Sequence, residues 1–279
     1  MPLRSPVVGW SRVNECGTAQ QRQTAGEGPL TLVFAHGFGC DQHTWRLLVP
    51  HFAARYRTVT FDHVGSGLSD VTAYDSAKYA SLQGYAQDVL EVVSEFGEGP
   101  VVFVGHSVSA MIGMLADLRA PDLFAAHIMV GPSPSYINDG DYVGGFERAD
   151  IDSLLETLEA NYLGWSSTMA PAIMGAPEQP ELAVELTNSF CRTDPEIAKQ
   201  FARVTFLSDC RADVARLRTP TLIIQSTEDI IAPMAVGEYL QRTLHNGNLR
   251  VVENVGHCPH LSAPSQSARA IDEFLAALG

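Results

Sequence analysis

A serine in a predicted strand-to-helix turn is the residue of this sequence whose setting most clearly suggests chemistry. Ser107 lies in the segment Gly105–Ser109 (GHSVS), which follows the apolar run Val101–Val104 and precedes a helical pattern. In a nucleophile elbow, a strained turn of this kind exposes a serine Oγ, and small residues two before and two after it let strand and helix approach closely. Gly105 meets this requirement, whereas Ser109 stands where Gly is usual. The pattern predicts Ser107 as a nucleophile, and the alternative is a serine that caps the helix.

A serine hydroxyl is a weak nucleophile and needs a positioned base. With an elbow of this kind the partners follow in the order Ser, acid, His, so the base is expected after the last strand. His257 follows the apolar run Leu249–Glu253, and His260 is a rival three residues further on. Cys258 is also adjacent, but neighbours along a strand or loop point apart, so we do not expect it to act as a nucleophile with His257.

The acid that orients the base is expected at a strand end between the serine and the histidine. Asp229 follows the apolar run Thr221–Gln225 in the segment STED. Glu228 is adjacent but is expected to point elsewhere, and Asp209 and Asp213 precede a strand and so lie at its wrong end. The role predicted for Asp229 is to hold the tautomer of the histidine and to stabilise the imidazolium, without taking the proton itself.

Acyl transfer to a serine also needs N–H donors for the negative charge that develops on the carbonyl oxygen. Val108, at the start of the helix, supplies one backbone N–H, and the segment His36–Gly39 (HGFG) is expected to supply a second from Phe38. The alternative for HGFG is a simple glycine-rich turn. A phosphate loop is not indicated, because neither GxxxxGK[ST] nor a GxGxxG that opens a helix occurs. The turn Gly65–Gly67 is expected to be structural.

The elements that must position these residues alternate between strand and helix. Short apolar runs rich in β-branched residues are typical of parallel strands buried on both faces, and such α/β folds bind ligands at the carboxyl ends of the strands. The predicted strands are Leu30–Ala35, Thr58–Phe61, Val101–Val104, His127–Val130, Thr221–Gln225 and Leu249–Glu253, and the predicted helices between them are Trp45–Arg55, Leu82–Phe96, Ser109–Arg119, Ala235–Leu244 and Ser265–Leu278.

Residues 132–209 interrupt this alternation with helical patterns and no good strand. An insertion of this length is too long for an ordinary loop, so we expect a helical cap over the strand ends. Residues 1–131 and 210–279 then form the core, and residues 1–28 are polar and weakly patterned.

Composition narrows the classes of function. The 279 residues carry 18 Lys+Arg and 32 Asp+Glu, a net charge of −14, which disfavours nucleic acid and anionic membranes as partners. The N-terminal segment has no signal-peptide pattern, and no apolar run approaches the length of a membrane span. The five cysteines (Cys16, Cys40, Cys191, Cys210 and Cys258) are scattered without a CxxC pair, which favours free thiols in the cytoplasm over disulfides or a zinc site.

Taken in order, the motifs HGFG, GHSVSA, the acid in STED and GHCPH resemble those of the α/β-hydrolases. Longer segments, including HGFGCDQHTW, FDHVGSGLSD, VGHSVSAMIGMLA, VGPSPSYINDGDYVGGFE and DIIAP, resemble the RsbQ-like branch, which comprises bacterial stress-regulator hydrolases and the plant strigolactone and karrikin receptor hydrolases. Together the matching segments cover most of residues 31–264. Residues 1–28 depart from the family pattern, and Pro132 matches the bacterial members better than the plant receptors.

The resemblance implies an α/β-hydrolase fold: a mostly parallel central sheet flanked by helices, with a four-helix cap of two V-shaped pairs over an apolar pocket. It implies Ser107, Asp229 and His257 as the triad and Phe38 and Val108 as the oxyanion-hole residues. The pocket walls that it implies are Phe38, His106, Tyr136, Trp165, Phe190 and Phe206, each of which could instead belong to the core of the cap.

The function expected is that of a serine hydrolase of the carboxylesterase or lactonase type, which cleaves small apolar esters or lactones through an acyl-Ser107 intermediate and needs no metal or organic cofactor. Hydrolysis of carbon–carbon bonds uses the same triad and stays open. The alternative is a ligand-sensing regulator with slow hydrolysis, which by resemblance would signal to a phosphatase-type partner protein. An inactive hydrolase-like protein is a third interpretation, disfavoured by the complete set of triad candidates.

Overall fold

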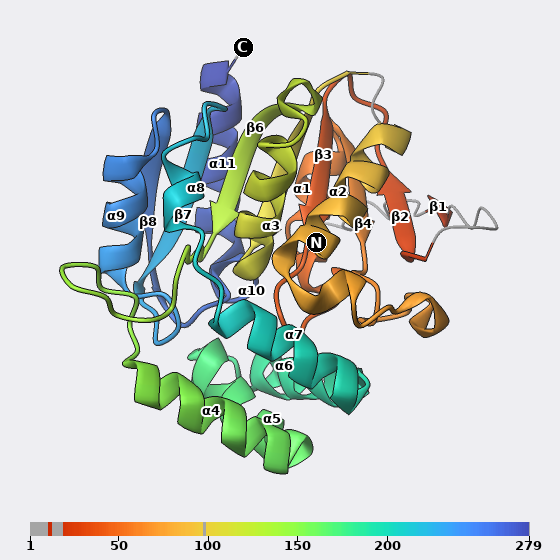
Figure 1. The fold of residues 1–279 in the computed structure, drawn as a ribbon. Helices are drawn as coiled ribbons and strands as arrows, with labels where there is room; N and C mark the ends of the chain where they lie inside the picture. Colours follow the sequence, from red (N-terminus) through yellow and green to blue (C-terminus); the bar gives the residue numbers. More distant parts are fainter. Residues whose placement is uncertain (1–10, 13–18, 97–98, 279) are drawn as a thin grey trace.

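The computed structural model describes residues 11–12, 19–96 and 99–278. The described residues form one eight-stranded sheet in the order β1-β2-β4-β3-β5-β6-β7-β8 (Figure 1). Strands β1 and β2 are antiparallel to their neighbours, and all later pairs are parallel. The strands are β1 (Ser11–Arg12), β2 (Arg22–Ala25), β3 (Thr31–Ala35), β4 (Arg57–Phe61), β5 (Val101–His106), β6 (Phe124–Val130), β7 (Thr221–Glu228) and β8 (Gly247–Val255). The predicted mostly parallel sheet is therefore confirmed.

Helices cover both faces of this sheet because its central strands are apolar on both sides. In β5 every residue is buried, with Phe103 packed on one face and Val104 on the other. Helices α2 (Leu82–Phe96), α3 (Val108–Asp117) and α9 (Met234–Thr243) pack on the first face, and α1 (Val49–Ala53) and α11 (Pro264–Leu278) on the second. The short elements are η1 (Gln42–Trp45), η2 (Val71–Ala73), η3 (Lys78–Ala80), η4 (Pro121–Leu123), α8 (Arg211–Val214) and α10 (Pro259–Ser262).

The helix predicted over Trp45–Arg55 is shorter than expected. The chain forms the turn η1, capped by the side chain of Asp41, and a separate helix α1 begins at Val49. Pro50 explains the break, because proline lacks the N–H that would continue a helix from the preceding turn, and its ring clashes with the carbonyl four residues back. Proline is tolerated in the first turn of a helix, where it stands here.

Four helices follow β6 and form a separate layer beyond the end of that strand (Figure 1). We call α4 (Arg148–Ala160), α5 (Tyr162–Met174), α6 (Pro180–Arg192) and α7 (Pro195–Phe206) the helical layer. Within it, α4 contacts α5 and α7, and α5 contacts α6. Its buried face packs on core residues that include Cys40, Ile231 and Leu261.

Two ion pairs and one backbone hydrogen bond tie the helical layer to the core. Arg192 on α6 pairs with Asp41 at 2.5 Å, and Glu185 on the same helix pairs with Arg46 at 2.6 Å. At the end of α5 the carbonyl of Ile173 accepts a hydrogen bond from the N–H of His257, with an N···O distance of 2.8 Å. These contacts fasten α5 and α6 to the core.

The N-terminal segment contributes to the sheet, which its weak pattern did not predict. β2 pairs antiparallel with β4, and the buried Arg22 forms an ion pair with Glu95 on α2. Cys16 lies outside the described residues, and the four other cysteines are free thiols. Within the part of the chain that the structure describes, no helix is long and apolar enough to cross a membrane.

Candidate active site

Ser107 occupies a sharp turn between β5 and α3. Its backbone has φ 55° and ψ −125°, a conformation that L-residues rarely adopt and that costs on the order of 1–3 kcal/mol. A Cβ on Gly105 would lie 2.6 Å from the backbone of Ser109, so only glycine lets the strand pass this close to the helix. The surrounding β5 and α3 are buried and hold the strained turn in place.

His257 joins the serine to a carboxylate. Its Nε2 lies 2.8 Å from Ser107 Oγ, and its Nδ1 lies 2.7 Å from Asp229 Oδ2. Because a carboxylate only accepts, Nδ1 carries the proton and Nε2 accepts from the serine hydroxyl. The structure thus brings together the three side chains that the sequence singles out.

The carboxylate of Asp229 is fully engaged. Its Oδ1 accepts the backbone N–H groups of Ile231 (2.8 Å) and Ala232 (3.1 Å), while its other oxygen bonds to His257. Burial alone would raise the pKa of Asp229, but the nearby His257 and these hydrogen bonds outweigh it, so the pKa lies below the usual value. The carboxylate therefore stays ionised beside the imidazole.

The other acids considered from the sequence lie elsewhere. Glu228 is exposed at the end of β7, Asp209 pairs with Arg211 at 2.6 Å, and Asp213 pairs with Arg216 at 2.6 Å. Each is therefore either in solvent or committed to an arginine.

Two residues beside His257 have structural partners of their own. His260 Nε2 bonds to Thr44 Oγ1 at 2.8 Å, and burial lowers the pKa of its imidazole far below the usual value, so it stays neutral. The Sγ of Cys258 lies 4.0 Å from His106 Nε2, and burial raises the pKa of the Cys258 thiol, which opposes thiolate formation. Neither is arranged as a partner of Ser107.

The HGFG segment sits directly against the elbow. A Cβ on Gly37 would lie 2.7 Å from His106 Nδ1 and 3.1 Å from the Cβ of Ser107, so this position needs glycine for the close approach. Gly39 has φ +73° and lies against the ring of Phe190. The arrangement leaves Phe38 between the two glycines, with its ring in the pocket wall.

The turn Gly65–Gly67 after β4 packs against the carboxylate of Asp62. Gly67 has φ +56°, and a Cβ there would lie 2.4 Å from the carboxyl carbon of Asp62. That carboxylate accepts the backbone N–H groups of Gln42 (2.7 Å) and Leu68 (3.0 Å). Asp62 therefore ties the loop after β4 to the turn η1.

A pocket lies above Ser107, between the helical layer and the core. Five of the six wall residues implied by resemblance line it, namely Phe38, His106, Tyr136, Phe190 and Phe206. Trp165 does not. Its ring packs behind the wall, with its centroid 6.2 Å from that of Phe38 and 5.7 Å from that of Phe190, and it lines a groove between α4 and α5 instead.

Sequence reasoning missed six lining residues: Cys40, Ile173, Leu186, Thr205, Ile231 and Cys258. Cys40 directly follows the HGFG segment, Cys258 directly follows His257, and Ile231 follows Asp229 by two positions. Their nearness to these motifs could have identified them as pocket residues. Ile173 and Leu186 are ordinary apolar positions of α5 and α6, and nothing in the sequence marks them.

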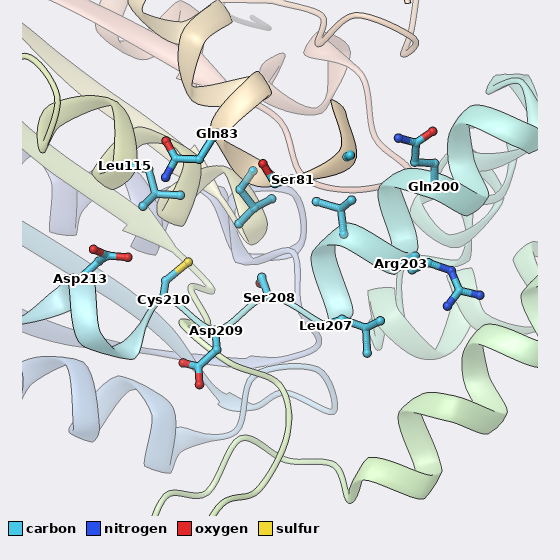
Figure 2. Close-up of a pocket in the computed structure, with 13 residues that line it drawn as sticks. Ser81, Gln83, Leu115, Gln200, Arg203, Leu207, Ser208, Asp209, Cys210 and Asp213 are labelled. Atoms are coloured by element: carbon cyan, nitrogen blue, oxygen red, sulfur yellow. The ribbon is translucent and has the colours of Figure 1, made fainter. Parts of the chain in front are cut away.

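The pocket is narrow in this structure. Its cavity has a volume of only about 30 Å³. A wider hollow of about 570 Å³ lies on the other side of α7, lined by Gln83, Arg203 and Leu207 among others (Figure 2). The charged ends of Arg203, Asp209 and Asp213 point in different directions there, so the hollow lacks a convergent set of polar groups.

This arrangement can carry out nucleophilic acyl chemistry. A neutral imidazole that accepts from a serine hydroxyl, and whose other nitrogen is held by a carboxylate, can remove the serine proton as the hydroxyl attacks a carbonyl. Among the described residues no group of three or more His, Cys, Asp or Glu side chains is placed to hold a metal ion.

Comparison with known proteins agrees with this fold. Residues 32–270 match the model of the alpha/beta hydrolase family. The karrikin insensitive 2 receptor CA of Petunia hybrida is 41% identical over 240 residues, covering 86% of this chain and 89% of that protein. A strigolactone esterase of Arabidopsis thaliana is 39% identical over 256 residues, covering 91% and 95%. A solved hydrolase from Oleispira antarctica has a TM-score of 0.89 at 39% identity, covering 91% and 94%. With its sheet, its elbow and relatives of this closeness, the chain belongs to the alpha/beta hydrolase family.

Proposed function

We propose that this hydrolase cleaves carboxylic esters or lactones of small apolar substrates through an acyl-Ser107 intermediate, with Ser107, His257 and Asp229 as its triad. The observation that carries the proposal is the unbroken line of hydrogen bonds from Asp229 Oδ2 through His257 to Ser107 Oγ, with distances of 2.7 and 2.8 Å. The esterase named among the relatives supports ester cleavage as the reaction class.

In the first half of the reaction, His257 Nε2 takes the proton of Ser107 as Oγ attacks the carbonyl carbon. The tetrahedral intermediate collapses, the bond to the leaving oxygen breaks, and the imidazolium returns its proton to that oxygen. In the second half, His257 takes a proton from a water molecule as the water oxygen attacks the acyl-serine. The bond from the acyl carbon to Ser107 Oγ breaks, the imidazolium returns the proton to Oγ, and the acid leaves. Asp229 stays ionised throughout and stabilises the imidazolium.

The negative charge on the carbonyl oxygen would be held by the backbone N–H groups of Val108 and Phe38. Val108 is the first residue of α3, where N–H groups have no acceptor within the helix and where the helix dipole favours negative charge. The contact of Gly37 with the elbow supports Phe38 as the second donor, because it holds the adjoining peptide close to Ser107.

The pocket supports apolar substrates because its walls are mostly aromatic and aliphatic side chains. Substrate contacts are proposed for Phe38, His106, Tyr136, Phe190 and Phe206. We further propose that residues 132–209 act as a cap over a core of residues 1–131 and 210–279. The narrow pocket between cap and core admits a small acyl group, and larger substrates require the cap to move.

The test is Ser107→Ala, assayed with p-nitrophenyl acetate and p-nitrophenyl butyrate. Loss of a triad member typically lowers kcat by about 10⁴-fold or more. Ser166→Ala serves as the matched control, because this buried hydroxyl donates to Tyr162 O within α5, away from the nucleophile. Mass spectrometry should find the acyl adduct on the Ser107 peptide only in the wild-type protein and the control. Retained activity in Ser107→Ala would refute the assignment.

A ligand-sensing regulator is the second candidate, and the receptor named among the relatives at 41% identity favours it. In that case slow hydrolysis would report the ligand to a partner protein of the phosphatase type in the cytoplasm. The rate of turnover distinguishes the regulator from the metabolic hydrolase: a kcat of about 1–10³ s⁻¹ on some ester favours the metabolic hydrolase. Turnover over minutes to hours, with ligand-dependent binding of a partner, favours signalling.

A further inference from the structure

Buried hydrogen bonds connect the segments that follow three neighbouring strands, namely the loops after β3 and β4 and the start of α3 after β5. His36 follows β3, His63 follows β4, and Ser109 lies just after the elbow that follows β5. All three side chains are buried. None of the steps proposed above uses them.

The donors and acceptors of these groups can be assigned one by one. Ser109 Oγ donates its single proton to His36 O (2.5 Å), so it accepts from His63 Nε2 (2.8 Å). The backbone N–H of His63 donates to His36 Nε2 (3.1 Å), which places the remaining proton of a neutral His36 on Nδ1. That Nδ1–H then donates to the carbonyl oxygen of Gly37 at 2.9 Å.

The last of these bonds bears on the proposed oxyanion hole. The carbonyl of Gly37 and the N–H of Phe38 belong to one planar trans peptide unit and point in opposite directions. A donor that holds the Gly37 oxygen therefore sets the direction in which the Phe38 N–H points. The Cys40 N–H, at 3.2 Å, holds the same oxygen from the far side of the turn.

The geometry points to Ser109 and His63 as positioning residues that aim the Phe38 N–H at the substrate carbonyl oxygen through His36. This inference rests on the proposed serine-hydrolase function. The positioning role explains the use of serine rather than the usual glycine at position 109, because glycine has no hydroxyl to bond His36 O. Burial lowers the pKa of His63 well below the usual value, which keeps its ring neutral and its single N–H available to Ser109.

The test compares phenyl acetate with its thiono analogue, in which sulfur replaces the carbonyl oxygen. Sulfur accepts hydrogen bonds poorly, so a well-aimed oxyanion hole favours the oxygen ester, and a misaimed one loses that preference. We expect Ser109→Ala to lower kcat for phenyl acetate about 10- to 100-fold with KM changed less than about 3-fold, since removing a whole oxyanion donor costs about 10²- to 10³-fold. The oxygen-to-sulfur rate ratio should fall about 10-fold.

His63→Phe is the second variant. It keeps the aromatic packing of this ring against Phe61, Tyr85 and Phe201 but removes the donor to Ser109. It should lower the rate ratio to a similar extent, and the double variant should be no worse than either single one, because both act through His36. If Ser109→Ala fails to fold, as judged by its melting temperature, His63→Phe carries the test.

Three controls separate the possible failures. Ser166→Ala removes a buried hydroxyl remote from the loop and should leave the rate ratio unchanged. An unchanged ratio in the folded Ser109→Ala or His63→Phe protein overturns the positioning role. Ser107→Ala must be inactive on phenyl acetate; if it is active, the proposed function itself has failed, whatever the other variants do.

Discussion

His257 Nδ1 lies 2.7 Å from Asp229 Oδ2, and the second oxygen of that carboxylate is held by two backbone N–H groups. The aspartate therefore cannot turn away from the imidazole without losing both backbone bonds. This fixed carboxylate stabilises the imidazole tautomer that carries its proton on Nδ1, which leaves Nε2 free to accept from Ser107.

Asp229→Asn should test this selection. An amide NH₂ facing Nδ1 favours the wrong tautomer, and we expect kcat on p-nitrophenyl acetate to fall by about 10⁴-fold. Glu228→Gln is the matched control, because its exposed side chain is next in sequence, and it should change kcat less than about 2-fold. An Asp229→Asn protein with more than a tenth of wild-type activity would exclude Asp229 as the acid.

Acid sensitivity of the fold should come from buried neutral histidines. Burial lowers the pKa of His106 to about 3 and those of His63 and His260 well below the usual value. In the unfolded chain each has a pKa of about 6.5, so between that value and the folded pKa the unfolded state binds more protons. Stability is thus complete above pH 6.5 and falls on acidification, by up to about 1.4 kcal/mol per pH unit for each histidine.

We therefore expect the urea midpoint to fall steadily from pH 7 to pH 5. His63→Phe has one such histidine fewer, so the slope of its unfolding free energy against pH should be shallower over the same range. Equal slopes in the two proteins would show that His63 is not protonated on unfolding in this window.

Entry of larger substrates should depend on the ion pairs between α6 and the core. Arg192–Asp41 and Arg46–Glu185 hold α6 beside the narrow pocket, and both involve partly exposed side chains. Pairs of this kind contribute up to about 1 kcal/mol. Arg192→Ala should therefore raise kcat/KM for p-nitrophenyl octanoate by about 2- to 5-fold and leave the acetate unchanged. Arg148→Ala, which removes an ion pair within α4, is the control. A similar change for both esters would argue against a barrier at α6.

Gly256 should be intolerant of a side chain. It has φ +116°, and a Cβ there would lie 1.9 Å from the carbonyl oxygen of Met174. Gly256→Ala should displace His257 from Ser107 and lower both the melting temperature and kcat, the latter by at least about 10-fold. Gly140→Ala is a control that also places alanine at a positive φ (+58°), with less backbone strain than at Gly256 and with nothing within 4 Å of the added carbon. Equal losses in both would show that the close contact with Met174 is not what makes Gly256 intolerant of a side chain.

Short sequence patterns predicted the features that depend mainly on residues close together along the chain. Apolar runs ending in small residues predicted the central strands, and Ser107, Asp229 and His257 were singled out because each follows such a run within a few residues. Patterns failed where the outcome depends on long-range packing. Trp165, which the family resemblance implied as a pocket wall, does not line the cavity, and its ring packs against those of Phe38 and Phe190.

The bonds among Ser109, His63 and His36 could not be predicted either. They join residues 27 to 73 positions apart, and only the order of β4, β3 and β5 in the sheet brings them together. The strand β2 was missed for a related reason. Its sequence, RQTA, has little apolar character, and its place is set by pairing with β4 and by the ion pair of Arg22.

The hydrogen bond from the His257 N–H to Ile173 O has a mechanical consequence. The end of α5 and the loop that carries the base share this bond, and Gly175 and Gly256 pack against each other beside it without side chains. If the helical layer swings open, this junction is the natural pivot: α6 and α7 can travel outward while the end of α5 stays with the base. An opening that instead pulled α5 away from the core would draw His257 away from Ser107. The enzyme would then be inactive while the entrance to its pocket is open.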